Sequence, residues 1–240
     1  MNIALIKAGG IGSRMGAGIP KQFLLVEGKP IVVYTLEVFE RHPGIDAIIV
    51  VCVDGWHDVL KSYIKKYNIT KVASIVSGGE TSLKSIKEGI RESMRLFSRD
   101  DTILIHDANR PLVEEEIISD VLAQCNLHGS AVAAIPCTDE VMQTDGHSMS
   151  SDMFLDRTTL YRIQTPDAYN LGEVSEVLES ATEGQLTELG ATNTLMISAG
   201  HKVYFAKGSE VNIRLTTQED ITLLKSLLYV RSVDSCAERA

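Results

Sequence analysis

The stretch from Ala4 to Phe23, ALIKAGGIGSRMGAGIPKQF, constrains the fold of this chain more than any other segment. Its apolar start predicts a buried strand, and the glycines that follow predict a loop whose backbone comes close to a ligand. Those glycines are Gly9, Gly10, Gly12 and Gly16. Two cations, Arg14 and Lys21, lie in the same loop, and Pro20 stiffens the chain before Lys21. Backbone N–H donors beside fixed positive charges predict a polyphosphate site.

Other kinds of glycine-rich loop fit this stretch less well. It lacks the GxxxxGK[ST] spacing of a Walker-type P-loop. Gly10, Gly12 and Gly16 overlap dinucleotide-binding patterns, but those patterns expect an acidic residue about 20 positions further on. The nearest candidate, Asp54, comes too late. A plain strand-to-helix turn explains the glycines but not the two cations, and a nicotinamide or flavin enzyme stays open as an alternative.

Length and composition fit one globular α/β domain. The chain has 240 residues, of which 44% are hydrophobic, and we expect a single domain over residues 1–240. Its net charge of −9, with no basic cluster, argues against nucleic acid or an anionic membrane surface as a partner. The four cysteines show no metal-ligand spacing. We therefore expect reduced thiols, no secretion signal, no membrane span and a cytoplasmic location.

Apolar strands and helices alternate from the first strand to Pro136. The run DAIIVVCV is apolar without interruption, as in a central parallel strand that is buried on both faces. Because strand and helix alternate five times, we predict an α/β fold with a doubly wound, mostly parallel sheet of the Rossmann-like kind. Ligands of such sheets bind beyond the carboxyl ends of the strands. The opening loop, the SGGE turn and the segment HDANRP all fall at that edge.

The second half of the chain is less regular. From 138 to about 158 the apolar periodicity fails, and a polar turn around Gly146 separates two short strand-like pieces. This pattern predicts a β-hairpin arm that projects from the main body, with an ordinary surface hairpin as the alternative. Further on we expect a helix near 188–198, a short strand over 212–215 and a last helix that packs on the sheet. Thr216 and Glu219 form a capping pattern at its start.

The segment HDANRP, residues 106–111, is the second strong signal for chemistry. Asp107 stands at the tip of a buried strand and is expected to face the same crevice as the glycine loop. Mg²⁺ bound to a nucleotide typically takes one or two such carboxylates, with waters as its other ligands. Asp107 is therefore the candidate metal ligand, with Mg²⁺ or another divalent cation as the cofactor. A turn or capping role for Asp107 is the alternative.

The motifs KAGGIGSRMG and PKQF resemble the signature loop of the cytidylyltransferases that activate sugar-alcohol phosphates, and HDANRP resembles that family's second motif. The family holds the methylerythritol phosphate and ribitol phosphate enzymes, and the resemblance covers almost the whole chain. It implies that Arg14 and Lys21 stabilise charge at the phosphorus under attack. It also implies that the loop wraps the triphosphate of CTP through Lys7, Ala8, Gly9, Gly10 and Gly12.

Two further motifs imply how the nucleotide and the metal are held. The turn GGETSLKS is similar to the family's contact with cytosine and ribose, which falls here on Gly79, Glu80 and Ser85. By the same resemblance Asp107 would hold the metal and the ribose, and Arg110 would line the acceptor side. This chain departs from the family at Ser82, where relatives commonly have arginine.

The acceptor half of the site matches the family more loosely. DRTTLYRIQTP is similar to the segment in which an arginine of the partner's arm, here Arg157, binds the acceptor phosphate. Its Thr-Pro turn would place Thr165 on the pocket wall. NIRLTT matches the family's NIKxT with Arg214 in place of lysine, and TEL replaces TDE at Thr187. Glu140 stands where relatives carry threonine, and its carboxylate would repel an anionic acceptor unless it pairs with a cation.

The resemblance implies a homodimeric cytidylyltransferase, joined through its arm, that converts CTP and a polyol phosphate into a CDP-polyol and pyrophosphate. A long span between the GGE turn and HDANRP, together with NIRLTT and PKQF, favours D-ribitol 5-phosphate as acceptor. The alternative acceptor is 2-C-methyl-D-erythritol 4-phosphate of isoprenoid biosynthesis. The departures at Ser82, Glu140 and Arg214 leave open a catalytically silent nucleotide-binding protein.

Overall fold

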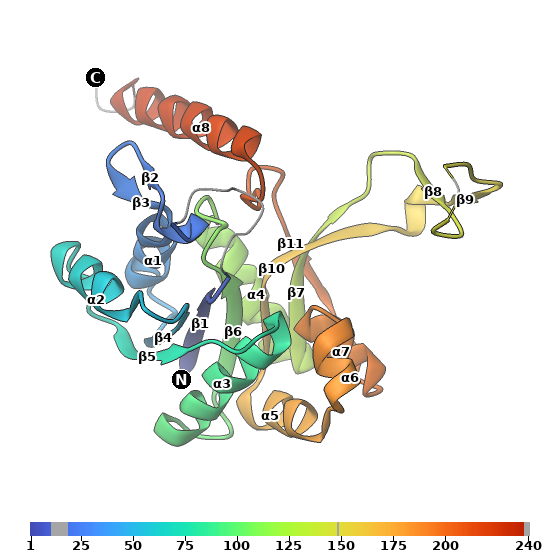
Figure 1. The fold of residues 1–240 in the computed structure, drawn as a ribbon, viewed down its shortest axis with the longest axis horizontal. Helices are drawn as coiled ribbons and strands as arrows, with labels where there is room; N and C mark the ends of the chain where they lie inside the picture. Colours follow the sequence, from blue (N-terminus) through green and yellow to red (C-terminus); the bar gives the residue numbers. More distant parts are fainter. Residues whose placement is uncertain (11–18, 148, 238–240) are drawn as a thin grey trace.

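The computed structural model describes residues 1–10, 19–147 and 149–237, and its centre is a seven-stranded sheet (Figure 1). The strands of this sheet are β1 (Asn2–Ala8), β4 (Ala47–Cys52), β5 (Val72–Ser77), β6 (Thr102–Asp107), β7 (Ser130–Pro136), β10 (Tyr161–Asn170) and β11 (Phe205–Lys207). They lie in the order β11-β7-β10-β6-β1-β4-β5, and within this sheet only β10 runs antiparallel to its neighbours. The predicted mostly parallel sheet is confirmed.

The described residues also form eight α-helices, most of which cover the two faces of the sheet. They are α1 (Ile31–Arg41), α2 (His57–Lys66), α3 (Ser82–Leu96), α4 (Glu115–His128), α5 (Leu171–Ser180), α6 (Glu183–Glu188), α7 (Thr192–Ser198) and α8 (Gln218–Ala237). Alternate residues of β1 enter opposite cores, because successive side chains of a strand point to opposite faces. Ala4 and Ile6 belong to the core with α1 and α4, whereas Ile3 and Leu5 belong to the core with α3 and α5. The doubly wound α/β architecture follows directly.

A membrane-spanning helix was not expected from the sequence. Across the described residues, every helix is too short or too polar to cross a bilayer.

Strand β10 was not predicted from the sequence. It lies between β6 and β7, and its pairing with β7 shifts register between Ile163 and Asp167. Pro166 interrupts the strand pattern, and the peptide bond before it is cis. Gln164 and Asp167 of this strand are nevertheless buried, because partners in the fold satisfy them. The Gln164 side-chain amide, for example, donates to the Ser209 carbonyl at 2.8 Å.

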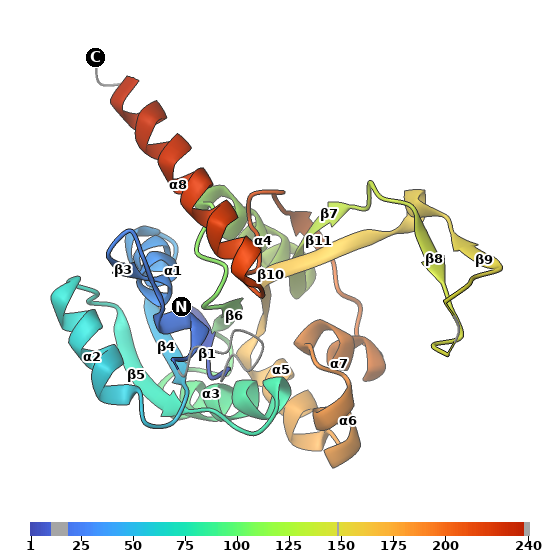
Figure 2. The same ribbon diagram turned by 45° about the horizontal axis from the view of Figure 1, so that its top comes forward.

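The predicted hairpin is present between β7 and β10. It consists of β8 (Val141–Gln143) and β9 (Met153–Leu155), which pair in antiparallel fashion. Figures 1 and 2 both show it projecting away from the sheet and its helices. Its large apolar side chains Met142, Met153 and Phe154 are 67%, 55% and 77% exposed. An exposed apolar group of this kind is typical of an interaction surface.

The expected helix near 188–198 is confirmed in part, because α7 covers residues 192–198, but the expected strand at 212–215 was wrong. The helical region is two short helices, α6 and α7, separated at Gly190, whose φ of +68° ends the first of them. Residues 212–215 lie in no strand of the described structure. Instead the Leu215 N–H donates to the Asn109 carbonyl at 2.9 Å, which ties this segment to the loop after β6.

The last helix, α8, does not pack on the sheet as expected. It covers the small hairpin of β2 (Leu25–Val26) and β3 (Lys29–Pro30) and the start of α1, and it extends past them (Figure 2). Leu223, expected to be buried, is 46% exposed. Asp220 rather than Glu219 accepts the Thr216 N–H, at 2.6 Å. The core beneath the helix consists of Val26, Ile31, Leu112, Leu215, Ile221 and Leu224.

Candidate active site

A cavity of about 360 Å³ lies at the carboxyl ends of β1 and β6, beside the N-terminus of α3. This is the edge at which ligands of doubly wound sheets bind. The structure brings most of the nucleotide-site residues expected from the sequence onto its wall. They are Lys7, Gly9, Gly10, Lys21, Gly79, Glu80, Ser85, Asp107 and Arg214.

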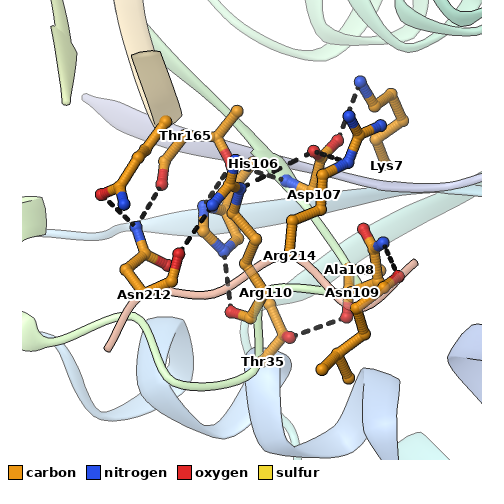
Figure 3. A network of polar contacts seen from close by, with 12 residues as sticks. Lys7, Thr35, His106, Asp107, Ala108, Asn109, Arg110, Thr165, Asn212 and Arg214 are labelled. Atoms are coloured by element: carbon orange, nitrogen blue, oxygen red, sulfur yellow. Dashed lines mark hydrogen bonds and ion pairs between the residues drawn. The ribbon is translucent and has the colours of Figure 1, made fainter. Parts of the chain in front are cut away.

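Asp107 is the centre of a charge cluster (Figure 3). Lys7 Nζ lies 2.8 Å from its Oδ1, and Arg214 Nε lies 3.3 Å from its Oδ2. Arg110 Nε approaches the same Oδ2 at 3.9 Å. Burial by itself would raise the pKa of the Asp107 carboxyl, but Lys7, Arg214 and Arg110 together hold it well below its usual range. The carboxylate is therefore ionised at neutral pH and surrounded by cations.

His106, fully buried, fixes the backbone on which Asp107 stands. Its Nε2 lies 3.2 Å from the Arg110 carbonyl, which can only accept, so Nε2 carries the proton. Nδ1 then accepts from the Thr165 hydroxyl at 3.1 Å, and the Thr165 oxygen accepts the Asp107 N–H at 3.2 Å. Burial lowers the pKa of His106 to about 4. Because both ring nitrogens are engaged, this neutral histidine positions the backbone and is not a general base.

Arg214 is held in the cavity by contacts that the sequence did not reveal. The segment that carries it is tied to the loop after β6, where the Asn109 side chain donates to the Leu215 carbonyl at 2.6 Å. Arg110 donates from NH1 to the Asn212 carbonyl at 2.6 Å. Arg110 is thus only 9% exposed. It was expected to line the acceptor side of the site, but it is not among the residues that line the cavity. The asparagine in HDANRP is the sequence signal for the first link, whereas the second link uses a backbone carbonyl that the sequence does not mark.

The opposite wall is formed by the Gly79 turn and the first turn of α3. A Cβ at Gly79 would lie 2.6 Å from the Lys84 Cβ, so only glycine allows this close approach. The Ser85 hydroxyl accepts the Gly79 N–H at 3.0 Å and donates to its carbonyl at 3.1 Å. Ser85 thereby shapes the turn itself. The N-terminus of α3 directs its positive dipole end at the cavity, which favours a negatively charged ligand.

Gln22 anchors the ends of the glycine loop, a role that sequence reasoning missed. Its side-chain amide donates to the Ala8 carbonyl at 2.6 Å and to the Gly10 carbonyl at 3.0 Å. Gln22 is 2% exposed, and the next residue, Phe23, stacks on Trp56 with ring centroids 4.7 Å apart. Gln22 of the motif PKQF therefore ties this motif to the end of β1 and to the first glycines that follow it.

Several expected site residues lie elsewhere. Gly12 and Arg14 fall outside the described residues. Arg157 and Glu140 sit on the arm, away from the cavity, and form an ion pair of 3.1 Å that neutralises the Glu140 carboxylate. Thr187 is exposed on α6, and its hydroxyl donates to a carbonyl of the same helix. The nucleotide half of the expected site is thus assembled within one chain, whereas the acceptor half is not.

Asp167, on β10 behind the cluster, leads to a prediction about stability. It is 3% exposed, and the Tyr169 hydroxyl donates to its Oδ2 at 2.8 Å. Burial raises the pKa of Asp167 to about 7, against about 3.9 in an unfolded chain. The folded state keeps the proton longer, so this residue's contribution to stability is full below pH ~4 and is lost as the pH rises through ~7.

Asp167→Asn cannot ionise and should escape that loss. Between pH 4.5 and pH 8, its free energy of unfolding should rise relative to wild type by roughly 2 to 4 kcal/mol. Urea unfolding at the two pH values measures this change. Asp152→Asn, on the exposed arm, is the control and should show no such trend. A constant difference between Asp167→Asn and wild type across this range would contradict the assignment.

The fold and the cavity define a nucleotide-binding protein of the doubly wound class, with a glycine loop, a helix N-terminus and clustered cations at one sheet edge. The comparison with protein families agrees and is more specific. The family model of 2-C-methyl-D-erythritol 4-phosphate cytidylyltransferase (IspD) matches residues 2–230. The chain belongs to this family and is therefore a nucleotidyltransferase.

The individual relatives are named for two different acceptor substrates. The chain is 40% identical to the ribitol-5-phosphate cytidylyltransferase of Lacticaseibacillus paracasei over 95% of this chain and 98% of that protein. It is 33% identical to the 2-C-methyl-D-erythritol 4-phosphate cytidylyltransferase of Clostridium acetobutylicum, over 97% and 100%. Among solved structures, the 4-diphosphocytidyl-2C-methyl-D-erythritol synthase of Anaerococcus prevotii superposes with a TM-score of 0.81 at 26% identity, covering 95% of this chain and 96% of that one.

Proposed function

We propose that this cytidylyltransferase converts CTP and D-ribitol 5-phosphate into CDP-ribitol and pyrophosphate. The observation that carries the choice of acceptor is the higher identity to a relative named for ribitol 5-phosphate, 40% against 33% for one named for 2-C-methyl-D-erythritol 4-phosphate. The family model carries the second name, so that acceptor is the alternative. The sequence features NIRLTT and PKQF support the first choice.

The cavity suits an in-line transfer in which an acceptor phosphate oxygen attacks the α-phosphorus of CTP. The new P–O bond forms as the bond to pyrophosphate breaks. A phosphate monoester is already a nucleophile at neutral pH, so the protein contributes positioning and charge stabilisation. Lys21 and Arg214 place cations on the cavity wall, and the N-terminus of α3 adds a partial positive charge. The neutral, fully engaged His106 is consistent with a reaction without a general base.

We include Mg²⁺ as the cofactor, with Asp107 as its protein ligand. The two carboxylates on the cavity wall are Asp107 and Glu80, and Glu80 already pairs with Lys84 at 3.1 Å. No group of three or more His, Cys, Asp or Glu side chains in the described residues could hold an ion. A site with one such carboxylate suits a cation that enters bound to the nucleotide phosphates and takes a single protein ligand. When bound, Mg²⁺ would neutralise phosphate charge.

Location and assembly complete the proposal. Cys52 and Cys125 are free, buried thiols, which supports a reducing compartment such as the cytoplasm. The exposed apolar side chains of the arm support a homodimer in which each arm covers the partner's acceptor site. In this arrangement Arg157, paired with Glu140 on the arm, would reach the acceptor phosphate from the other subunit.

A subunit-mixing experiment tests this assembly. Arg157→Ala and Lys21→Ala homodimers should each be nearly inactive, because each lacks one half of every composite site. Mixed and allowed to exchange, they should regain up to roughly a quarter of wild-type activity, since random pairing leaves half the dimers with one intact site of two. Exchange is followed by native mass spectrometry. Demonstrated exchange with no recovery would place Arg157 in its own subunit's site or outside any site.

Pyrophosphate release tests the reaction itself. With CTP and Mg²⁺, D-ribitol 5-phosphate should give a kcat/KM at least roughly 100-fold above that of 2-C-methyl-D-erythritol 4-phosphate, because hydroxyl-binding groups left unpaired by the wrong acceptor penalise it strongly. UTP, ATP and GTP should be poor donors for the same reason. Preference for the methylerythritol compound would reverse the acceptor assignment. Stabilisation by NAD(P) and not CTP, or CTP binding without turnover of either acceptor, would overturn the proposal.

A further inference from the structure

The position of Lys7 goes beyond a simple phosphate contact. Lys7 and Asp107 are paired residues of the neighbouring parallel strands β1 and β6, so both side chains leave the sheet at the same point of its ligand edge. Lys7 Nζ is 2.8 Å from Asp107 Oδ1 and also donates to the Ser82 hydroxyl at 3.1 Å. Ser82 is the first residue of α3, on the opposite wall. The Lys7 side chain therefore spans the cavity between two elements.

Both oxygens of Asp107 are held by cations in this state. In the ion pairs of the described residues, Lys7 contacts Oδ1, whereas Arg214 and, at longer range, Arg110 face Oδ2. One negative charge is thus surrounded by three positive charges. A divalent cation that approached this carboxylate without a nucleotide would meet net positive charge and find neither oxygen open.

Lys7 is the cation whose departure would open Oδ1, and it can leave more readily than Arg110. Arg110 is buried and tied to the Asn212 carbonyl, but the Lys7 ammonium has a flexible stem and a second partner in Ser82. Movement of this one group would open Oδ1, and one carboxylate oxygen is what a nucleotide-bound Mg²⁺ needs. The phosphates of an arriving nucleotide would supply the negative charge that draws the ammonium away.

We propose that Lys7 couples metal binding to nucleotide binding: it occupies Oδ1 of Asp107 in the free protein and passes to the nucleotide phosphates, so that the carboxylate accepts metal only when nucleotide is present. This inference rests on the proposed use of CTP and Mg²⁺. It predicts that one variant changes the affinity for metal and the affinity for nucleotide in opposite directions. Removal of the Lys7 charge strengthens the binding of metal alone and weakens the binding of nucleotide alone.

The test uses Lys7→Met and two separate titrations of the full chain. Mn²⁺, which takes the same oxygen ligands as Mg²⁺, is titrated without nucleotide and followed by electron paramagnetic resonance. CTP is titrated calorimetrically in the presence of EDTA. Lys7→Met should bind Mn²⁺ roughly tenfold more tightly than wild type, and CTP roughly tenfold more weakly, because one like charge close to the ion is removed and one phosphate partner is lost.

Three control variants distinguish loss of the Lys7 charge beside Asp107 from a general effect of substitution. Lys29→Met removes an equally short, 2.8 Å ion pair with Glu37 outside the cavity and should change neither titration. Lys7→Arg keeps the charge and should leave Mn²⁺ binding weak. Lys7→Met combined with Asp107→Asn should lose the gain in Mn²⁺ affinity. Mn²⁺ affinity that is unchanged or lower in Lys7→Met, or a gain that persists in the double variant, would overturn the inference.

The proposed function is tested by measurements on the wild-type protein, separately from the inference about Lys7. Failure of wild-type protein to bind CTP or to release pyrophosphate would overturn the function itself. Normal CTP binding and turnover by wild type, with both affinities lowered together in Lys7→Met, would leave the function intact and reduce Lys7 to a structural residue.

Discussion

Lys21→Ala should lower kcat by roughly a hundred- to a thousandfold, about 3 to 4 kcal/mol in transition-state stabilisation, by analogy with the loss of one preorganised oxyanion donor. Lys21 lies on the cavity wall between Pro20 and the buried Gln22, so its backbone is anchored on both sides. A cation held in this way meets charge that grows on the phosphoryl oxygens as the reaction proceeds. The KM for CTP should change much less than kcat.

Single-turnover kinetics with saturating CTP and acceptor separate the chemical step from product release. Lys61→Ala, on the exposed side of α2, is the matched control and should react like wild type. A chemical step in Lys21→Ala within a few-fold of wild type would reduce the loop to a binding element. Arg14→Ala, in the part of the loop outside the described residues, is expected to behave like Lys21→Ala.

Asp107→Asn should reduce both turnover and stability. Turnover should fall by about a thousandfold or more, because the variant loses the carboxylate that we propose as the Mg²⁺ ligand. Stability at pH 7 should fall by about 3 kcal/mol, since Arg110 stays buried without its counter-ion. The depressed pKa of Asp107 sets the pH dependence: its stabilisation is present above the unfolded pKa of about 3.9 and is lost as the pH falls further.

Thermal unfolding from pH 7 to pH 3 measures this second effect. The deficit of Asp107→Asn relative to wild type should be largest near neutrality and should shrink below pH ~4. Asp100→Asn, exposed at the far edge of the sheet, is the control for general loss of one carboxylate. A deficit that did not change with pH would show that the ion pairs of Asp107 contribute little.

The nucleotide half of the site was largely predictable from the sequence, because its residues occupy short motifs at the ends of strongly apolar strands. Lys7 directly follows apolar residues of β1, and Asp107 is the last residue of β6. Parallel strands of a doubly wound sheet end at one edge, so sequence order alone brought these groups together. Gly79 and Ser85 follow in the same way from β5 and α3.

Strand β10 could not be predicted because its burial depends on partners that are remote in sequence. Gln164 bonds with the Ser209 backbone, and Thr165 bonds with His106. Polar residues and Pro166 in a strand normally indicate an edge or a loop. The segment NIRL was wrongly expected to be a strand. Its Leu215 N–H bonds with the Asn109 carbonyl in the loop after β6 and not with a neighbouring strand.

The antiparallel direction of β10 has a consequence for how this fold can be extended. Its chain enters the sheet at the edge where β6 and β7 finish, so the connection from β7 to β10 both leaves and returns on the side of the cavity. The hairpin of β8 and β9 is an insertion at that connection, and Figure 2 shows it standing clear of the helices. This insertion can be lengthened or changed in sequence while every strand pairing of the sheet stays in register. One reversed strand therefore gives the fold a place at its ligand edge where the chain can be extended independently of the sheet.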